Sequence, residues 1–129
     1  VLSETRKRSR DPGVTEWIAA TPIEQQRVSA LTIGEIARGV TRLRLRGNHT
    51  QATMFDGWLS EICAAFADRI VPVTADVAEL WGRHDPTRPT PVVDALIGAT
   101  AQAHGWTLVT RNAKDFEPTG VRVLNPFST

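Results

Sequence analysis

The stretch Thr90-Pro91-Val92-Val93-Asp94-Ala95-Leu96-Ile97-Gly98-Ala99-Thr100-Ala101 has the pattern of a buried helix with one acid in its first turn. Pro91 suits the first helical position, where its missing N–H is not needed, and Thr90 is the expected cap. Asp94 is the only charged residue between Thr90 and Gly105. Taken alone, Asp94 is most simply explained as a charge that complements the helix dipole, worth about 0.3–1 kcal/mol. The wide apolar face expected to be buried consists of Val92, Val93, Leu96, Ile97 and Ala101.

The length and composition predict one globular domain that spans residues 1–129. Hydrophobic residues make up 41% and charged residues 22% of the chain, which is ordinary for a globular protein. The net charge of +1 excludes a polycation, but the basic residues are clustered. Two clusters of four residues contain eight of the fifteen Lys and Arg residues. They are either ordinary solvated surface or patches that bind a phosphate backbone. They are Arg6, Lys7, Arg8 and Arg10, and Arg38, Arg42, Arg44 and Arg46.

Cysteine, histidine and hydropathy patterns exclude several classes of protein. Cys63 is the only cysteine, which rules out an intramolecular disulfide and fits a cytoplasmic location. The three histidines are far apart, so a zinc site is not expected. No apolar run is long enough to cross a bilayer, and no phosphate-binding P-loop is present.

Strand-like and helix-like segments alternate along the chain, which predicts a three-layer α/β fold with a central parallel sheet. Thr32 and Glu35 have the spacing of a capping box at the start of the second helix. The expected helices cover residues 11–20, 32–45, 50–67, 74–81 and 90–104, and the expected strands cover residues 27–30, 70–73, 106–110 and 121–124.

In such a fold, acids that follow different strands gather at one edge of the sheet. Glu35 and Asp94 begin helices that follow strands, while Asn112 and Asp115 lie just past the strand that ends at Thr110. That edge is where open α/β sheets place their sites. Clustered carboxylates repel one another unless a cation offsets their charge. Mg²⁺ prefers oxygen ligands of this kind, and such an ion can activate water to cleave a phosphodiester.

Four motifs, in order along the chain, resemble those of PIN-domain ribonucleases, in particular the VapC branch, the toxins of VapBC toxin–antitoxin pairs. They are Leu2-Ser3-Glu4-Thr5-Arg6-Lys7, Thr32-Ile33-Gly34-Glu35-Ile36-Ala37-Arg38-Gly39, Pro91-Val92-Val93-Asp94-Ala95-Leu96-Ile97 and Val109-Thr110-Arg111-Asn112-Ala113-Lys114-Asp115-Phe116. The resemblance implies a cytoplasmic, dimeric endoribonuclease that depends on Mg²⁺ or Mn²⁺ and is inhibited by a small antitoxin. Glu35 and Asp94 match the second and third acids of the family, and either Asn112 or Asp115 supplies the fourth position.

The chain departs from the family pattern at its beginning. The first acid of the family follows a strand that would end just before Val1. The resemblance implies that this strand is the middle one of the sheet, between the strands near Val28 and Trp106. We therefore expect the sequence as given to be N-terminally truncated, with a strand ending in Asp before Val1 in the native protein.

Basic and apolar residues outside the acid cluster suggest where RNA and protein partners bind. Arg6 and Lys7 follow the missing first acid, while Arg38 and Arg42 follow Glu35 by about one and two helical turns. We expect these four side chains to flank the acids and contact RNA phosphates. Met54 and Trp58 widen the apolar stripe of the third helix beyond what one core needs. They are expected to contact a second copy or the antitoxin.

Two other functions compete with metal-dependent RNA hydrolysis. The first is a PIN-like regulatory or interaction module whose acid pocket is weak or inactive. The second is a Mg²⁺-binding phospho-acceptor pocket like that of receiver domains. That pocket needs a separate Lys that reaches the acid, and Lys114 is a poor candidate because it shares a turn with Asp115.

Overall fold

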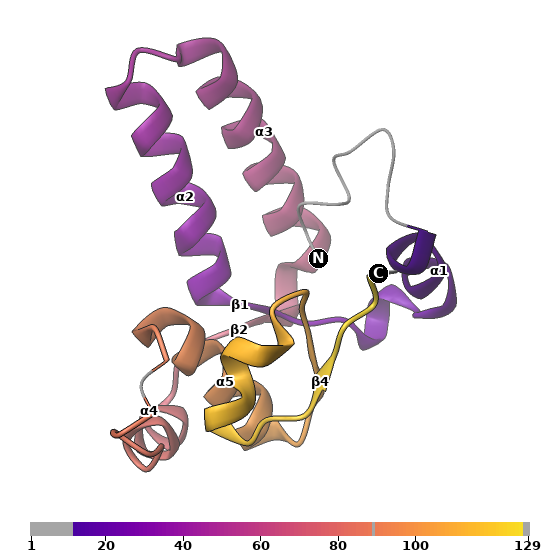
Figure 1. Cartoon of the computed structure of the whole chain (residues 1–129). Helices are drawn as coiled ribbons and strands as arrows, with labels where there is room; N and C mark the ends of the chain where they lie inside the picture. Colours follow the sequence, from indigo (N-terminus) through magenta and orange to yellow (C-terminus); the bar gives the residue numbers. More distant parts are fainter. Residues whose placement is uncertain (1–11, 89, 128–129) are drawn as a thin grey trace. The chain divides into compact units, whose positions relative to one another are not determined.

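The computed structural model describes residues 12–88 and 90–127, which form two compact units. The hairpin unit is Arg27–Val73. The terminal unit combines the described residues before and after it, 12–26, 74–88 and 90–127. Figure 1 shows the elements of both units along the chain. No described helix is long and apolar enough to cross a membrane.

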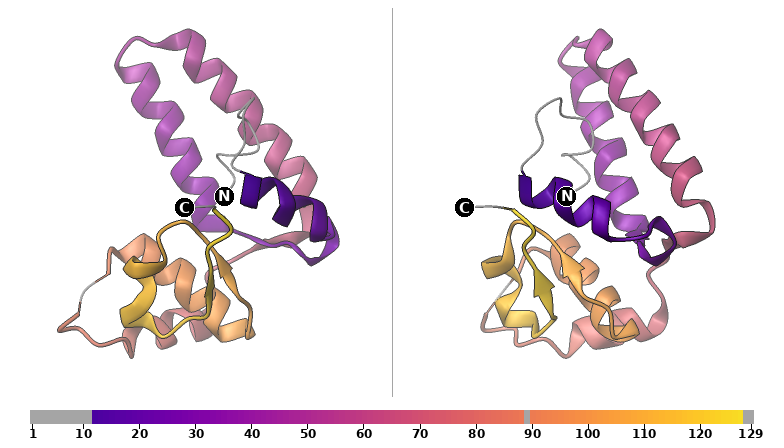
Figure 2. Two further views of the ribbon diagram at one scale, coloured as in Figure 1. Left: turned by 45° about the vertical axis from the view of Figure 1, so that its right-hand side comes forward. Right: turned by 90° about the vertical axis from the view of Figure 1, so that its right-hand side faces the viewer.

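The hairpin unit consists of two long helices joined to a pair of short parallel strands. α2 (Ala30–Leu45) and α3 (His49–Phe66) lie side by side in both views of Figure 2. β1 (Val28–Ser29) precedes them, and the 3-10 helix η3 (Ala67–Arg69) leads into β2 (Ile70–Val71) after them. The strands pair in parallel, with Val28 opposite Ile70. The buried apolar residues of this unit are Val28, Val40, Ala52, Ile62, Phe66 and Val71.

Local hydrogen bonds and one glycine fix both ends of α2. The hydroxyl of Ser29 accepts the N–H of Leu31 at 3.0 Å, so Ser29 caps α2 at the end of β1. The predicted capping box of Thr32 and Glu35 is therefore wrong, because the cap is Ser29, three residues before Thr32. Gly47, with φ of 80°, ends α2, and the N–H of Asn48 reaches the Leu43 carbonyl at 2.9 Å.

The terminal unit contains the remaining helices and a second parallel strand pair. It begins with α1 (Pro12–Ala20) and the 3-10 helix η2 (Ile23–Gln25), and resumes with α4 (Ala75–Gly82), which Thr74 caps. α5 (Val92–His104), β3 (Leu108–Val109), the 3-10 helix η4 (Ala113–Thr119) and β4 (Val123–Leu124) follow. β3 and β4 pair in parallel, with Leu108 opposite Val123.

All four predicted strands are present, and the α/β class with parallel pairing is confirmed. The described strands form two sheets of two strands each, β1–β2 and β3–β4. Among the described residues no strand joins these sheets into one. The residues that follow β3 form the 3-10 helix η4, with Phe116 buried.

The buried face of α5 differs from the predicted one. Its buried residues are small: Ala95, Gly98, Ala99, Thr100 and Ala101. Val92 is 56% exposed and Val93 37% exposed, so the prediction that both lie in the core is wrong. The close approach of Phe116 of η4 to the helix at Gly98 explains why the buried face of α5 consists of small residues.

Gly98→Val is expected to destabilise the protein by about 1–3 kcal/mol, since extra methyl groups overpack a filled site. A Cβ at position 98 would lie 3.2 Å from Phe116 Cδ1 and 3.7 Å from Thr119 Oγ1. Chemical denaturation measures the free energy of unfolding. Gly34→Val on α2 is the matched control, because a Cβ there meets nothing within 4 Å. Equal stability of the two variants would disprove close packing of α5 on η4.

Candidate metal and RNA site

Asp94 lies in the first turn of α5 and is partly buried. The backbone of Pro91 caps this helix without a side-chain hydrogen bond, and the Ala95 N–H binds the Pro91 carbonyl at 2.8 Å. The carboxylate of Asp94 therefore lies at the positive end of the helix dipole. The predicted cap, Thr90, is wrong: its hydroxyl instead donates to the carbonyl of Asp115 at 3.4 Å. This bond connects the start of α5 to η4.

Asn112 and Asp115 lie in the turn that follows β3. The Asn112 N–H donates to Thr110 Oγ1 at 3.2 Å, and the Asp115 N–H donates to the Asn112 carbonyl at 3.1 Å. These backbone bonds close the turn without using the side-chain oxygens of either residue. Both residues are exposed. Exposed side chains of this kind are accessible to a ligand.

Packing of η4 on α5 fixes the position of this turn in the terminal unit. Phe116, next to Asp115, is 5% exposed and contacts α5 at Gly98. The hydroxyl of Thr119 donates to the Phe116 carbonyl at 2.6 Å and stabilises the 3-10 helix. The structure thus brings together the two elements that carry Asp94 and Asp115.

Glu35 lies on α2, in the hairpin unit, and the residue is exposed. Because Ser29 caps the helix, Glu35 is not needed for the capping role that the sequence suggested. Its carboxylate belongs to a different unit from Asp94 and Asp115. The predicted acids are therefore divided between the two units.

The donor chemistry of the terminal unit fits a hard divalent cation. Neither unit, within its described residues, places three His, Cys, Asp or Glu side chains together as a metal site. Mg²⁺ needs only one or two protein carboxylates and keeps several waters, so the oxygens of Asp94, Asp115 and Asn112 suit it. Nitrogen and sulfur donors, which zinc sites use, are missing from this set.

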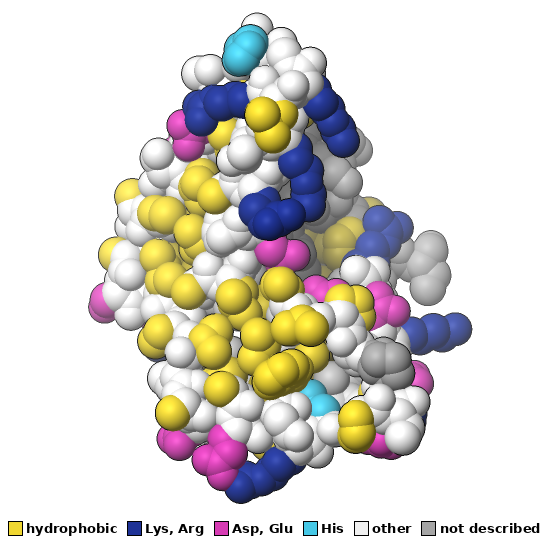
Figure 3. Space-filling model, turned by 90° about the vertical axis from the view of Figure 1, so that its left-hand side faces the viewer, with side chains coloured by type: hydrophobic (Ala, Val, Ile, Leu, Met, Phe, Trp, Pro, Cys, Tyr) yellow, Lys and Arg dark blue, Asp and Glu magenta, His cyan; other side chains and the backbone are white. Residues whose placement is uncertain are grey.

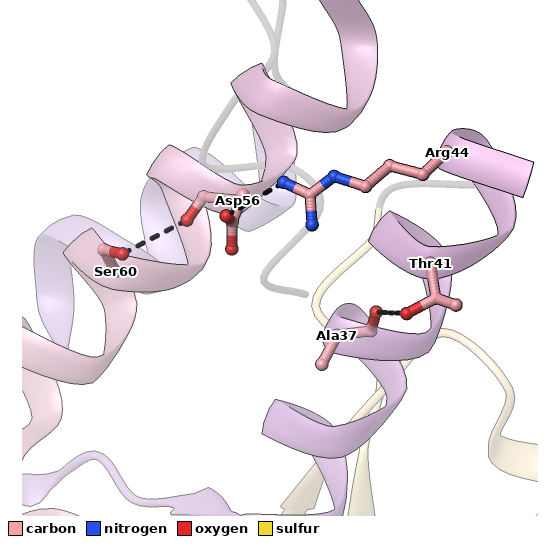
Figure 4. A network of polar contacts seen from close by, with 5 residues as sticks. All are labelled: Ala37, Thr41, Arg44, Asp56 and Ser60. Carbon is pink, nitrogen blue, oxygen red and sulfur yellow. Dashed lines mark hydrogen bonds and ion pairs between the residues drawn. The ribbon is translucent and has the colours of Figure 1, made fainter. Parts of the chain in front are cut away.

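Two of the four predicted RNA-binding residues are described, and both are exposed on α2: Arg38 and Arg42. Figure 3 shows Lys and Arg side chains gathered over the hairpin. Arg44 differs from them because its Nη2 lies 3.2 Å from Oδ2 of Asp56 on α3, as Figure 4 shows. Arg6 and Lys7 lie outside the described residues.

The predicted partner-binding residues lie on α3. Met54 is 63% exposed. Trp58 is partly buried, with its ring edge-on to Phe55 at a centroid distance of 6.2 Å. Met54 therefore offers apolar surface, whereas Trp58 also packs within its own helix.

Sequence reasoning missed one pair beside the acid turn. The guanidinium carbon of Arg111 lies 4.8 Å from the centre of the Phe127 ring. Arg111 was part of a recognised motif, but no local pattern indicated that Phe127 is its partner.

Comparisons with known proteins agree with this fold. A family model described as PIN domain matches residues 2–120. The VapC ribonuclease Y4jK of Sinorhizobium fredii is 31% identical, over 98% of this chain and 93% of that protein. The crystal structure of FitAcB from Neisseria gonorrhoeae superposes with a TM-score of 0.83 at 28% identity, covering 97% of this chain and 92% of that one. A toxin–antitoxin complex from Klebsiella pneumoniae matches with a TM-score of 0.59 at 26% identity, covering 91% of this chain and 86% of that one.

Proposed function

Because this chain belongs to the PIN-domain family, and to its VapC-type branch, we propose that it is a toxin ribonuclease held inactive by a cognate antitoxin. In finer detail, it is an endoribonuclease that depends on Mg²⁺ or Mn²⁺ and hydrolyses RNA phosphodiester bonds. The observation that carries this proposal is the packing of η4 on α5, which brings the Asp115 turn to the helix of Asp94. The name of the Sinorhizobium fredii relative supports the reaction class.

The acids and the neighbouring amide each have a role in this reaction. Asp94, Glu35 and either Asp115 or Asn112 would hold the cation. When bound, the ion would offset the charge of the phosphodiester and would lower the pKa of an attacking water. The carboxylates orient that water and take up its proton. The oxygen of the water forms the new bond to phosphorus, the bond between phosphorus and the ribose oxygen breaks, and that oxygen takes up a proton from solvent.

Incubation of the full protein with structured RNA, in Mg²⁺ and in EDTA, tests the proposal. Any residues encoded before Val1 must be included. We expect cleavage in Mg²⁺ that EDTA stops and added Mn²⁺ restores. Protein that leaves RNA intact in every condition, yet binds a partner, would instead support the interaction module. That alternative draws on the observation that neither unit has three acids together within its described residues.

The exposed arginines of α2 are proposed to contact RNA phosphates. Charge-neutral variants at Arg38 and Arg42 together are expected to flatten the salt dependence of RNA binding. The logarithmic slope should change by about 0.7 for each single-strand phosphate that the variant no longer neutralises. Fluorescence anisotropy over a salt series measures the slope. Wild-type slopes in the double variant would leave Arg38 and Arg42 as solvated surface only.

Met54 and Trp58 are proposed to contact either a second copy of the chain or the antitoxin. Met54 is exposed and Trp58 lies one helical turn further along α3, so a partner that covers both would bury apolar surface. Trp58→Lys should lower the mass measured by light scattering if a second copy binds there, or weaken antitoxin binding if the antitoxin does. Thr53→Lys, which also adds one charge to an exposed position of α3, is the matched control. Unchanged mass and unchanged antitoxin affinity in Trp58→Lys would exclude this surface as an interface.

A further inference from the structure

Arg111 presents an unneutralised positive charge at the end of β3, directly before the acid turn. It is exposed and forms no ion pair with any residue in the described part of the chain. Its guanidinium carbon lies 4.8 Å from the centre of the Phe127 ring. A guanidinium that stacks on an aromatic face keeps its in-plane N–H donors available, in a geometry that matches phosphate oxygens.

Two hydrogen bonds and the burial of Pro126 position the segment that carries Phe127. The Thr110 N–H donates to the Leu124 carbonyl at 3.0 Å. This bond extends the β3–β4 pairing to the residue before Arg111. Beyond it, the Phe127 N–H donates to Asn125 Oδ1 at 3.0 Å, and Pro126 is buried. The segment after β4 is therefore fixed at the same edge of the sheet as the start of the acid turn.

We propose that Arg111 binds an RNA phosphate beside the acids and that Phe127 is the residue that positions it. This inference rests on the proposed function and adds a substrate contact to it. The reason is electrostatic: a phosphodiester that approaches Asp94 and Asp115 is repelled by their charge, and a fixed cation beside them offsets that repulsion. Arg111 is next in sequence to Asn112, where the turn toward Asp115 begins.

RNA binding by four variants tests the pair. A short single-stranded RNA of mixed sequence serves as the probe, in EDTA, with anisotropy measured between about 50 and 200 mM salt. Arg111→Gln should weaken binding and reduce the logarithmic salt slope by about 0.7, the value for one phosphate on a single strand. Phe127→Ala should weaken RNA binding although the charge of Arg111 is still present. Phe127→Tyr, which keeps an aromatic ring, should bind RNA as the wild type does. In the double variant Arg111→Gln/Phe127→Ala, the loss should equal that of Arg111→Gln alone, because Phe127 acts through Arg111.

Arg122→Gln is the control for loss of one positive charge, and its melting curve accounts for the hydrogen bond that the Arg122 guanidinium donates to the Gly105 carbonyl. The carbonyl of Arg122 accepts the Leu108 N–H, which places this residue at the opposite end of the same strand pair. The substitution Arg122→Gln removes one positive charge and should leave the salt slope of RNA binding unchanged. Melting curves for all variants separate weakened binding from weakened folding.

The outcomes distinguish this inference from the proposed function. If the wild type cleaves RNA while Arg111→Gln keeps its slope, or if the two losses add in the double variant, the Arg111–Phe127 role is overturned and the nuclease stands. If RNA binds with the predicted slopes but is never cleaved, the phosphate contact is supported and the nuclease is rejected. Wild-type protein that neither binds nor cleaves RNA overturns both.

Discussion

Asp94→Asn is expected to abolish RNA cleavage by the full protein, with a loss of at least about 100-fold. Even changes to residues that merely support metal ligands cost about 10–100-fold. The substitution is nearly isosteric and removes one negative charge from the first turn of α5. Initial cleavage rates in saturating Mg²⁺ measure the loss.

Asp76→Asn provides the control for Asp94→Asn, because Asp76 is also an acid in the first turn of a helix of the terminal unit. Both variants lose a favourable helix-dipole interaction of about 0.3–1 kcal/mol. Asp94→Asn also removes repulsion from the neighbouring acids, so its melting temperature in EDTA should be at least that of Asp76→Asn. Retained Mg²⁺-dependent cleavage by Asp94→Asn would reject Asp94 as a ligand.

Asp115→Asn is expected to reduce cleavage by at least about 10-fold, the lower end of losses seen around metal sites. Asn112→Ala is expected to reduce it less. The reason is that the carbonyl of Asp115 accepts the hydroxyl of Thr90, just before α5, which ties its turn to the helix of Asp94. Its carboxylate also carries a charge that an amide lacks. Cleavage rates of the two variants over a series of Mg²⁺ concentrations measure how much each residue contributes. A greater loss of rate in Asn112→Ala than in Asp115→Asn would assign the fourth ligand position to Asn112.

Local sequence signals predicted most elements of the fold. The four strands were predicted, and the predicted ends of the second and fifth helices, at residues 45 and 104, agree with α2 and α5. Gly47 and Gly105 follow these ends, each with positive φ. The N-terminal cap of α2 was harder to predict, because Ser29 and Thr32 both carry a hydroxyl that can accept a backbone N–H. Ser29 is chosen because β1 pairs with β2 up to that residue, which is a contact between distant parts of the chain.

The buried face of α5 and the partner of Arg111 depend on tertiary contacts. Periodicity placed Val92 and Val93 in the core, but Phe116 requires a small-residue surface at Gly98. Phe127 reaches Arg111 only because β4 pairs with β3. Neither contact has a signal in the local pattern, so sequence reasoning could find the acids but not the packing around them.

Titration of Mn²⁺ into the full protein tests the proposed metal site most directly, because it requires no knowledge of the RNA substrate. The paramagnetic resonance signal of free Mn²⁺ reports binding. The wild type is expected to deplete this signal, Mg²⁺ to compete for the same site, and Asp94→Asn to leave the signal nearly undiminished. Equal Mn²⁺ binding by the wild type and Asp94→Asn, or no binding by either, would contradict the assignment of these acids as a metal site.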